Sequence, residues 1–174
     1  DSVETRFFAR TLTNHISHTH KNQRYRPNHG RRRCPLRSSS HGATAMKLYP
    51  HIEQFEGEKV VRIEGEFPSF RVVTNKNSYA AKTIVVAIGY SNTFDIQGLM
   101  EFVETHKKSV PEKQRIQLKN TDHLMTEGIY VAGTLAGWRS QLSIAAGSGA
   151  AVATDILTMW NNGIQSQSHD KIQK

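Results

Sequence analysis

The chain has 174 residues, 37% of them hydrophobic and 22% charged, which suits one ordinary domain or parts of two small ones and excludes a wholly disordered protein. Its single cysteine, Cys34, excludes an internal disulfide, a CxxC redox pair and a cysteine zinc cluster. The formal net charge is +8, and residues 1–50 carry all of the excess, with ten Lys and Arg against two acids.

The sequence predicts a soluble, cytoplasmic protein without a membrane partner. No apolar run approaches the roughly 18 residues that span a bilayer. Residues 1–12 have neither the basic n-region nor the apolar h-region of a secretory signal.

The first fifty residues predict one short helix followed by a loop. Apolar residues recur near helical spacing over residues 2–16, which indicates an amphipathic helix; they are Val3, Phe7, Phe8, Leu12 and Ile16. Residues 18–45 hold almost no large apolar side chain, so they read as a loop or a disordered segment.

Two features of this part have alternative interpretations. His15 and His18 share a helix face and could bind zinc or nickel with His41, but no acid or cysteine completes the set, so we predict no metal site. The basic run over residues 24–37 can contact a polyanion. With one aromatic residue and no nucleic-acid-binding motif, it predicts only nonspecific contact with nucleic acid.

From residue 51 the composition changes to short apolar runs. HIEQF (51–55), EKVVRIEGE (58–66) and FRVVTNKNSY (70–79) predict an antiparallel meander. The continuous apolar run over 84–88 predicts a strand that is buried on both faces.

The remaining runs alternate between helix and strand patterns. GLMEFVETHKK (98–108) predicts a short helix, and RIQL (115–118) with GIYVAG (128–133) predicts a pair of strands. We expect residues 84–88 and 129–132 to be central strands of one α/β architecture. The run over 140–162 predicts a helix that ends at Gly163.

Small residues are concentrated between the last predicted strand and this helix. Residues 128–157 include five glycines and seven alanines. A buried strand, a glycine turn and a helix can point the amino end of the helix at an anion or a polar ring edge. The alternative is that the small residues only let the helix pack closely on a sheet.

The order and spacing of these runs over residues 80–160 resemble the low-molecular-weight thioredoxin reductase group of pyridine nucleotide-disulfide oxidoreductases. In that family a buried strand ending in (A/T)-x-G leads back to the flavin domain, and Ala87, Ile88 and Gly89 match it. The flavin site of that family is closed by a second motif, a threonine followed by G-(I/V)-(F/Y)-A-x-G-D. After this motif come a helix start that contains a glutamine and a helix with the pattern AAGxGxxAA. The residues of the corresponding segments here are Thr126, Gly128, Ile129, Tyr130, Ala132, Gly133, Gln141, Ala145, Ala146, Gly147, Gly149, Ala150 and Ala151.

The chain also departs from this family. Thr134 replaces the aspartate that accepts a ribityl hydrogen bond, and neither a GxGxxG fingerprint nor a CxxC pair occurs. Residues 1–12 are faintly similar to the helix after the nucleotide-binding glycines. Arg31–Arg33 fall where the family's basic strand end meets the NADPH 2′-phosphate, but no strand pattern precedes them. These departures predict a truncated, frame-damaged or alternative product.

The resemblance implies an incomplete α/β fold with a Rossmann-like FAD/NAD(P)-binding architecture, that is, a sheet with flanking helices and a small antiparallel meander. Residues 1–50 would be a remnant of the NAD(P)-binding domain, 51–93 its meander and last strand, and 94–174 part of the FAD-binding domain. The implied function is a thioredoxin reductase-like FAD/NAD(P)-dependent oxidoreductase, or a truncated piece with little independent activity. The alternative is a non-catalytic interaction module whose basic segment contacts polyanions.

FAD is the cofactor that the resemblance implies first, and NAD(P)H the second. No catalytic residue is assigned. The implied cofactor-binding residues are Gly89, Gly133, Thr134, Arg139, Gln141, Leu142 and Gly147. Trp138 could lie against the flavin edge or only cover the helix start. A homodimer or a complementing chain is the expected partner, because the diphosphate-binding loop is missing.

Overall fold

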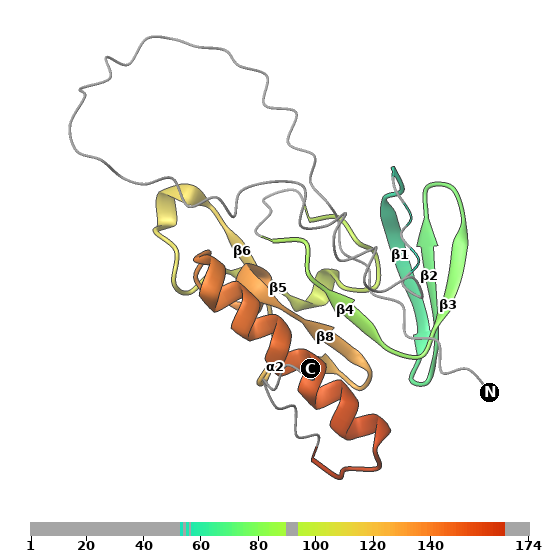
Figure 1. The fold of residues 1–174 in the computed structure, drawn as a ribbon. Helices are drawn as coiled ribbons and strands as arrows, with labels where there is room; N and C mark the ends of the chain where they lie inside the picture. Colours follow the sequence, from blue (N-terminus) through green and yellow to red (C-terminus); the bar gives the residue numbers. More distant parts are fainter. Residues whose placement is uncertain (1–52, 54, 56, 90–93, 166–174) are drawn as a thin grey trace. The chain divides into compact units, whose positions relative to one another are not determined.

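A computed structural model describes residues 53, 55, 57–89 and 94–165 (Figure 1). All helices and strands named below belong to one compact unit. A second unit, Thr13–Gly57, contributes only residues 53, 55 and 57, none of which lies in a helix or strand. The predicted helix over 2–16, the predicted loop over 18–45, and the histidine and arginine clusters lie outside the described residues.

The predicted antiparallel meander is confirmed for the runs over 58–66 and 70–79, with its strands divided differently from these runs. The run over 51–55 lies mostly outside the described residues, and residues 53 and 55 are in no strand. Strands β1 (Val60–Glu66), β2 (Ser69–Thr74) and β3 (Ser78–Ala81) form one antiparallel sheet in the order β1-β2-β3. The run over 70–79 therefore belongs to two strands, because the chain turns between Thr74 and Ser78. The turn is closed by a 2.9 Å hydrogen bond from the Thr74 N–H to the Asn77 carbonyl.

The carboxylate of Glu58 holds the open end of this meander together. It accepts hydrogen bonds from the Thr74 hydroxyl at 2.7 Å, the Asn77 amide at 2.9 Å and the Tyr79 hydroxyl at 2.9 Å. The hydrogen bond from Thr74 lowers the pKa of Glu58 the most, and those from Asn77 and Tyr79 lower it further. One acid thus ties the segment before β1 to both ends of the β2–β3 turn.

We expect Glu58→Gln to make the stability of the meander less dependent on acid pH. Because the folded-state pKa of Glu58 lies below its unfolded value, its contribution is present above about pH 4.3 and lost as the pH falls through the folded pKa. Urea unfolding at pH 7 and at pH 3 measures the effect. The parent should lose more stability between the two pH values than the variant does, and equal losses would contradict the assignment.

A second sheet combines the two buried runs that the sequence predicts as central strands. Strand β4 (Ile84–Val86) pairs in parallel with β8 (Ile129–Val131), and β7 (Leu124–Thr126) pairs antiparallel with β8. Only β8 is central. Within the described residues β4 is an edge strand. It ends at Val86, and the two residues that follow it are less buried: Ala87 is exposed and Ile88 is half-buried.

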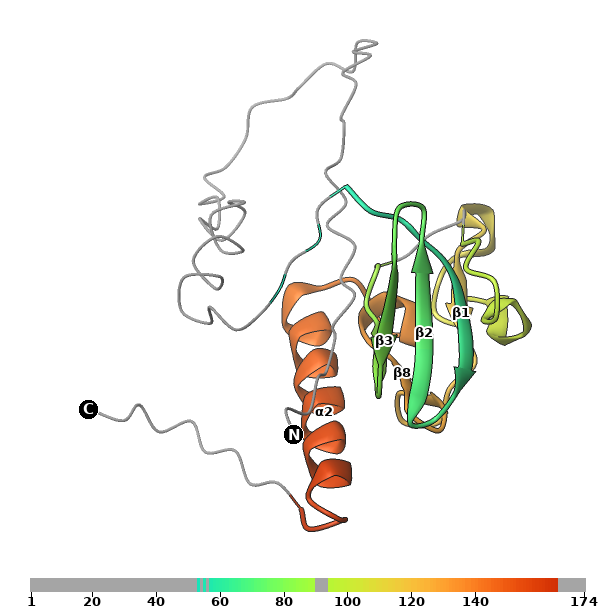
Figure 2. The ribbon, with the colours of Figure 1, turned by 90° about the vertical axis from the view of Figure 1, so that its right-hand side faces the viewer.

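Both faces of the β4–β8 pair are buried, as predicted. Ile84 and Val86 pack with Phe70, Val72 and other side chains in the larger core cluster. On the opposite face are Val85, Tyr130, Ala132, Val152 and Ile156. The strand period of two sends alternate side chains to the two sides. Figure 2 shows α2 (Leu142–Trp160) on one side of β8 and the meander on the other.

Two expectations about the segment between these strands are wrong. The predicted helix over 98–108 is instead a short 3-10 helix, η1 (Met100–Phe102), followed by strand β5 (Val103–Thr105). Strand β6 (Ile116–Leu118) pairs with β5 and not with β8. The choice of partner depends on tertiary packing, which a short apolar run does not encode.

The long helix α2 is confirmed over Leu142–Trp160, and Gly163 closes it with φ +83° and a 2.9 Å bond to the Thr158 carbonyl. Its buried stripe consists of Ser148, Val152 and Ile156. The alternative interpretation, in which the central glycines let the helix pack closely on a sheet, is wrong. Gly147 and Gly149 are exposed, and a Cβ at either would meet no atom within 4 Å.

By length and composition alone, α2 also qualifies as a candidate membrane span, with a mean hydropathy of 1.4 over an 18-residue window. This departs from the sequence expectation that no run is long enough. It is weak evidence, because core helices of soluble proteins meet the same criterion. Here one stripe of α2 packs on the sheet.

The mixed α/β class is confirmed. The described residues hold three small sheets and one α-helix, and one core cluster draws members from both sides of residue 93. The Rossmann-like arrangement stays a prediction, since a single parallel strand pair is described.

Candidate functional site

The two motif glycines follow neighbouring parallel strands. Gly89 comes three residues after β4 and Gly133 two residues after β8, and the Ala132 N–H donates to the Val86 carbonyl at 3.0 Å. Parallel strands place their carboxyl ends at the same sheet edge, where ligands of α/β proteins bind. Gly89 has φ +72° and Gly133 has φ +73°, and a Cβ at either would meet no atom of the described residues within 4 Å. The space beside both backbones is therefore open.

A hydrogen-bond network holds Gly133 against α2. The Gly133 N–H donates to Ser148 Oγ at 2.7 Å, and Ser148 Oγ lies 3.5 Å from His123 Nδ1. Because a carbonyl oxygen can only accept, His123 Nδ1 is the protonated nitrogen, and it donates to the Val131 carbonyl at 3.0 Å. The Val131 N–H in turn donates to the His123 carbonyl at 2.9 Å. Both side chains are buried, so the turn after β8 is rigidly anchored.

Thr134 lies in the 3-10 helix η3 (Gly133–Ala136) and is only 6% exposed. Within the described part of the chain, its hydroxyl has no hydrogen-bond partner. The Thr134 hydroxyl oxygen is also not fully enclosed, unlike the unpaired hydroxyl oxygens of Thr83 and Ser109. A hydroxyl in this position can take one hydrogen bond from a ligand at the sheet edge.

Trp138, in the loop before α2, contacts side chains from two other segments of the chain. Its ring stacks on His123, with centroids 6.0 Å apart and planes inclined by 25°, and Lys108 Nζ lies 4.3 Å from the ring centroid. The Trp138 carbonyl accepts from His106 Nε2 at 3.3 Å. These contacts give the ring a structural role, while 42% of the residue stays exposed.

The other predicted residues lie in the loop before α2 or in its first two turns, and all are exposed. They are Arg139, Gln141, Leu142 and Gly147. Gln141 is the N-cap, but no side chain caps the helix and no acid occupies its first turn. The first N–H groups of α2 are thus available to an electron-rich ligand atom.

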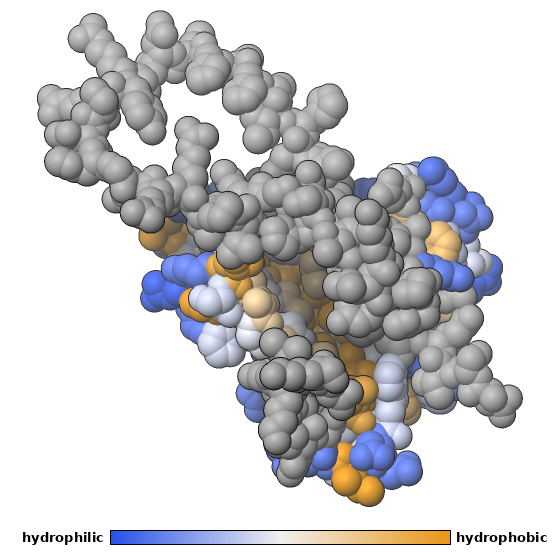
Figure 3. Space-filling model, in the orientation of Figure 1, coloured by the Kyte–Doolittle hydropathy of each residue, from blue (hydrophilic) through white to orange (hydrophobic). Residues whose placement is uncertain are grey.

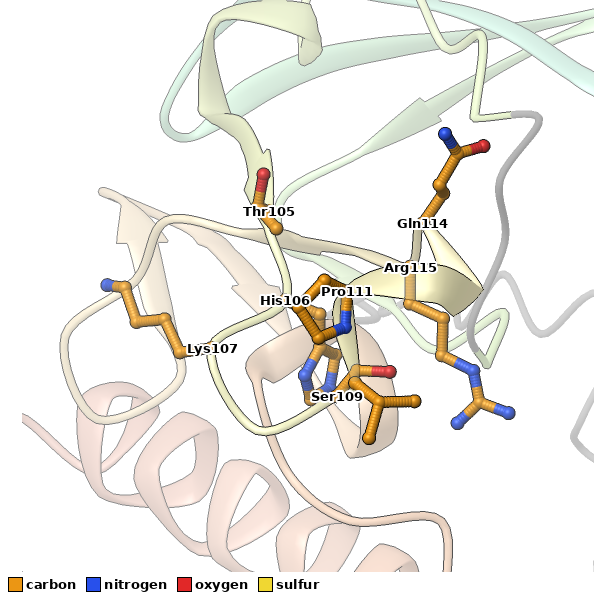
Figure 4. Close-up of a pocket in the computed structure, with 8 residues that line it drawn as sticks. Thr105, His106, Lys107, Ser109, Pro111, Gln114 and Arg115 are labelled. Atoms are coloured by element: carbon orange, nitrogen blue, oxygen red, sulfur yellow. The ribbon is translucent and has the colours of Figure 1, made fainter.

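A hollow of about 290 Å³ lies in the β5–β6 loop, and none of these residues lines it (Figure 4). Its lining includes His106, Lys107, Ser109 and Arg115. Figure 4 shows the charged ends of Lys107 and Arg115 extending in different directions, so they do not converge on one anion. His106 uses both ring nitrogens, because Nδ1 accepts the Lys108 N–H at 3.2 Å and Nε2 donates to Trp138.

A carboxylate and an amide stiffen the base of this hairpin. Gln117 donates to Glu104 at 2.7 Å and accepts the Lys107 N–H at 3.0 Å. The Lys107 ammonium, followed by Gln117, lowers the pKa of Glu104. Gly137 packs on Gln117, since a Cβ there would lie 2.9 Å from Oε1. The hairpin therefore supports the turn that carries Thr134.

The polar supports of the site have no signature in the sequence. His106, Gln117, His123 and Ser148 are each at least nine-tenths buried. Their partners are largely backbone groups of distant segments, which no local motif announces. No group of three potential metal ligands occurs within the described residues, and the histidines considered as ligands above, His15, His18 and His41, lie outside them.

No protein-family model matches the sequence, and no curated protein matches it at a significant level. Among solved structures, the chain is similar to a ferredoxin-flavin thioredoxin reductase from Clostridium acetobutylicum. The identity is 15% and the TM-score 0.49, over 71% of this chain and 77% of that chain. This is a distant likeness in fold, and the function proposed below rests on the residues of the site.

Proposed function

We propose that this chain is a thioredoxin reductase-like flavin-dependent oxidoreductase, or a piece of one, with little or no independent activity. The observation that carries the proposal is the open sheet edge after two neighbouring parallel strands. Two left-handed glycines, Gly89 and Gly133, leave space there, and the uncapped start of α2 follows in the same chain segment.

The residues present fit the ring end of a flavin better than its diphosphate end. Backbone N–H groups at Leu142 and Ser143 would face the electron-rich pyrimidine edge, where such donors stabilise negative charge. Thr134 would hydrogen-bond the ribityl chain. The sequence holds no GxGxxG loop for the diphosphate, so a complementing chain or weak binding is expected. The flavin itself would supply hydride transfer chemistry.

The first test is the colour of the purified full chain. A flavoprotein is yellow and absorbs in the flavin bands, either as isolated or after incubation with FAD. A colourless chain that FAD does not reconstitute would overturn the flavin proposal. It would then favour the alternative of a non-catalytic module with a basic contact segment.

We expect Thr134→Asp to bind FAD about tenfold more tightly than the parent. A charge-assisted hydrogen bond contributes about 1.5–3 kcal/mol, against roughly 0.5–1.5 for a neutral one. Quenching of flavin fluorescence or calorimetry measures the dissociation constant. Because residue 134 is nearly buried, a urea melt of the variant without FAD must first show that it folds.

Thr121→Asp is the matched control, because Thr121 is exposed and lies outside the site. The same charge there should leave FAD binding unchanged or slightly weaker, since FAD is an anion. Equal binding by the parent and both variants would mean that residue 134 does not face the ribityl chain.

A further inference from the structure

Helix α2 buries one polar side chain among apolar ones. Figure 3 shows hydrophobic residues on the surface over α2 and at its carboxyl end, so the helix is apolar beyond its contact with the sheet. Its buried stripe nevertheless contains Ser148, beside Val152 and Ile156, and Ser148 is only 6% exposed. A hydroxyl in such a place destabilises the fold unless hydrogen bonds compensate for its burial. Ser148 therefore marks a polar contact that the fold retains.

His123, whose Nδ1 lies near Ser148, belongs to a strained turn. Asp122 and His123 form a two-residue hairpin loop with φ values of +46° and +74°, closed by two hydrogen bonds of 2.9 Å between Thr121 and Leu124. Such a loop favours glycine at its second position. Hairpin loops also lie at the surface as a rule, whereas His123 is only 7% exposed. Strained residues of this kind are concentrated at functional sites.

His123 contacts each segment around the turn after β8. Its Nδ1–H donates to the Val131 carbonyl at 3.0 Å, and its own carbonyl accepts the Val131 N–H at 2.9 Å. The last residue of β8 is therefore held at both of its backbone groups. The imidazole ring stacks on Trp138, in the loop before α2. His123 thus joins β8 to that loop beside the point where Gly133 begins η3.

Two donors converge on Ser148 Oγ. The Gly133 N–H lies at 2.7 Å and His123 Nδ1 at 3.5 Å. The longer contact is weak as a hydrogen bond, but it turns a proton, and not a lone pair, toward the hydroxyl oxygen. Ser148 then directs its own proton elsewhere and keeps a lone pair toward Gly133. The side chain of His123 therefore decides how Ser148 receives the turn.

We propose that His123 is a positioning residue of the candidate site. Its Nδ1–H acts through Val131 and Ser148 to hold Gly133, and with it the hydroxyl of Thr134, in the orientation that a ligand at the sheet edge meets. The fold accepts the strained turn because the turn places this proton at the end of β8. The effect on flavin binding rests on the proposed function, whereas the anchoring of Gly133 depends on no ligand.

Two substitutions of His123 separate the role of its proton from that of its ring. His123→Asn keeps an N–H donor close to the position of Nδ1 and tolerates the left-handed backbone, but it loses the stacking on Trp138. His123→Phe keeps an aromatic ring and has no donor. A role in packing requires the ring, and a role in positioning requires the donor. We therefore expect His123→Phe to release the turn and His123→Asn to preserve it.

Amide hydrogen exchange of the full chain, measured by NMR, tests the anchoring without a ligand. The readout is the exchange rate of the Gly133 N–H relative to that of the Ile84 N–H, which donates to the Gly128 carbonyl at 2.9 Å and reports global opening. We expect His123→Phe to raise this ratio at least about tenfold and His123→Asn to change it less than about threefold. An unchanged ratio in His123→Phe, or a larger rise in His123→Asn, would overturn the proposal.

Ser148→Ala tests the second link of the same path. Because it removes the acceptor of the Gly133 N–H, it should raise the ratio as His123→Phe does, and the double variant should add little to either. Effects that multiplied in the double variant would mean that the two residues act independently, and the path would be wrong. Thr83→Val is the matched control, since the Thr83 hydroxyl is equally buried and has no partner among the described residues.

Circular dichroism and a urea melt first establish that each variant folds. If His123→Phe does not fold, Ser148→Ala decides alone, and an unchanged exchange ratio in that variant overturns the proposal.

Flavin binding to the full chain gives the second readout. His123→Phe and Ser148→Ala should each weaken FAD binding at least about tenfold in fluorescence quenching, and His123→Asn less than about threefold. If the parent and all three variants bound FAD equally, the positioning role in the site would be wrong. If the parent bound no FAD, the proposed function would fail, and the exchange ratio would still decide whether His123 anchors Gly133.

Discussion

Val86→Asp is expected to lower the free energy of unfolding by roughly 3–5 kcal/mol. Val86 is 4% exposed, and its side chain lies in the larger core cluster with those of β8 and the meander. An unpaired carboxylate in this position costs roughly 3–5 kcal/mol. A small domain has only about 5–15 kcal/mol of stability in total. Circular dichroism during thermal and urea unfolding measures the loss.

Ala87→Asp is the matched control for this substitution. Ala87 is the next residue, but it is exposed just beyond the end of β4. The same carboxylate there should change the free energy of unfolding by less than about 0.5 kcal/mol. If Val86→Asp melted within about two degrees of the parent, the assignment of β4 to the core would be wrong.

Gly98→Ala is expected to destabilise the fold by about 2–5 kcal/mol. Gly98 has φ +87°, and a Cβ there would overlap the carbonyl oxygen of Ile63 in β1. The left-handed backbone costs an alanine about 1–2 kcal/mol, and overlap with an immobile backbone atom adds about 1–3. The Ile63 N–H donates to the Gln97 carbonyl at 3.0 Å, so the substitution also disturbs the contact between this segment and β1.

Gly163→Ala separates the two contributions. Gly163 has a similar φ of +83°, but a Cβ there would meet no atom within 4 Å. It should therefore cost only the backbone strain of about 1–2 kcal/mol. Urea unfolding of both variants measures the difference, and equal losses would show that the Ile63 carbonyl does not constrain position 98.

The strongest local patterns predicted their elements well. The valine- and isoleucine-rich runs predicted the meander and the buried pair β4 and β8, because continuous apolar strands are stable only when both faces are covered. The long apolar run ahead of Gly163 predicted α2 over Leu142–Trp160. In each case the residues that form the element also carry the pattern that identifies it.

Short runs were predicted poorly, because their structure depends on partners far away in the chain. Residues 98–108 have helical spacing, yet Val103–Thr105 become a strand once β6 lies beside them. The predicted strand pairing of residues 115–118 with residues 128–133 is wrong for the same reason. A three-residue strand gains most of its stability from its neighbour, so its partner cannot be inferred from its own composition.

The candidate site shows the same division. The sequence by itself determined that Gly89 and Gly133 follow buried strands and that a long helix follows the second. Only the tertiary structure decided that the strands are parallel neighbours, and that Ser148 and His123 anchor the turn after β8. It also decided that the small face of α2 looks outward, since a helix with two apolar sectors can turn only one of them toward its sheet.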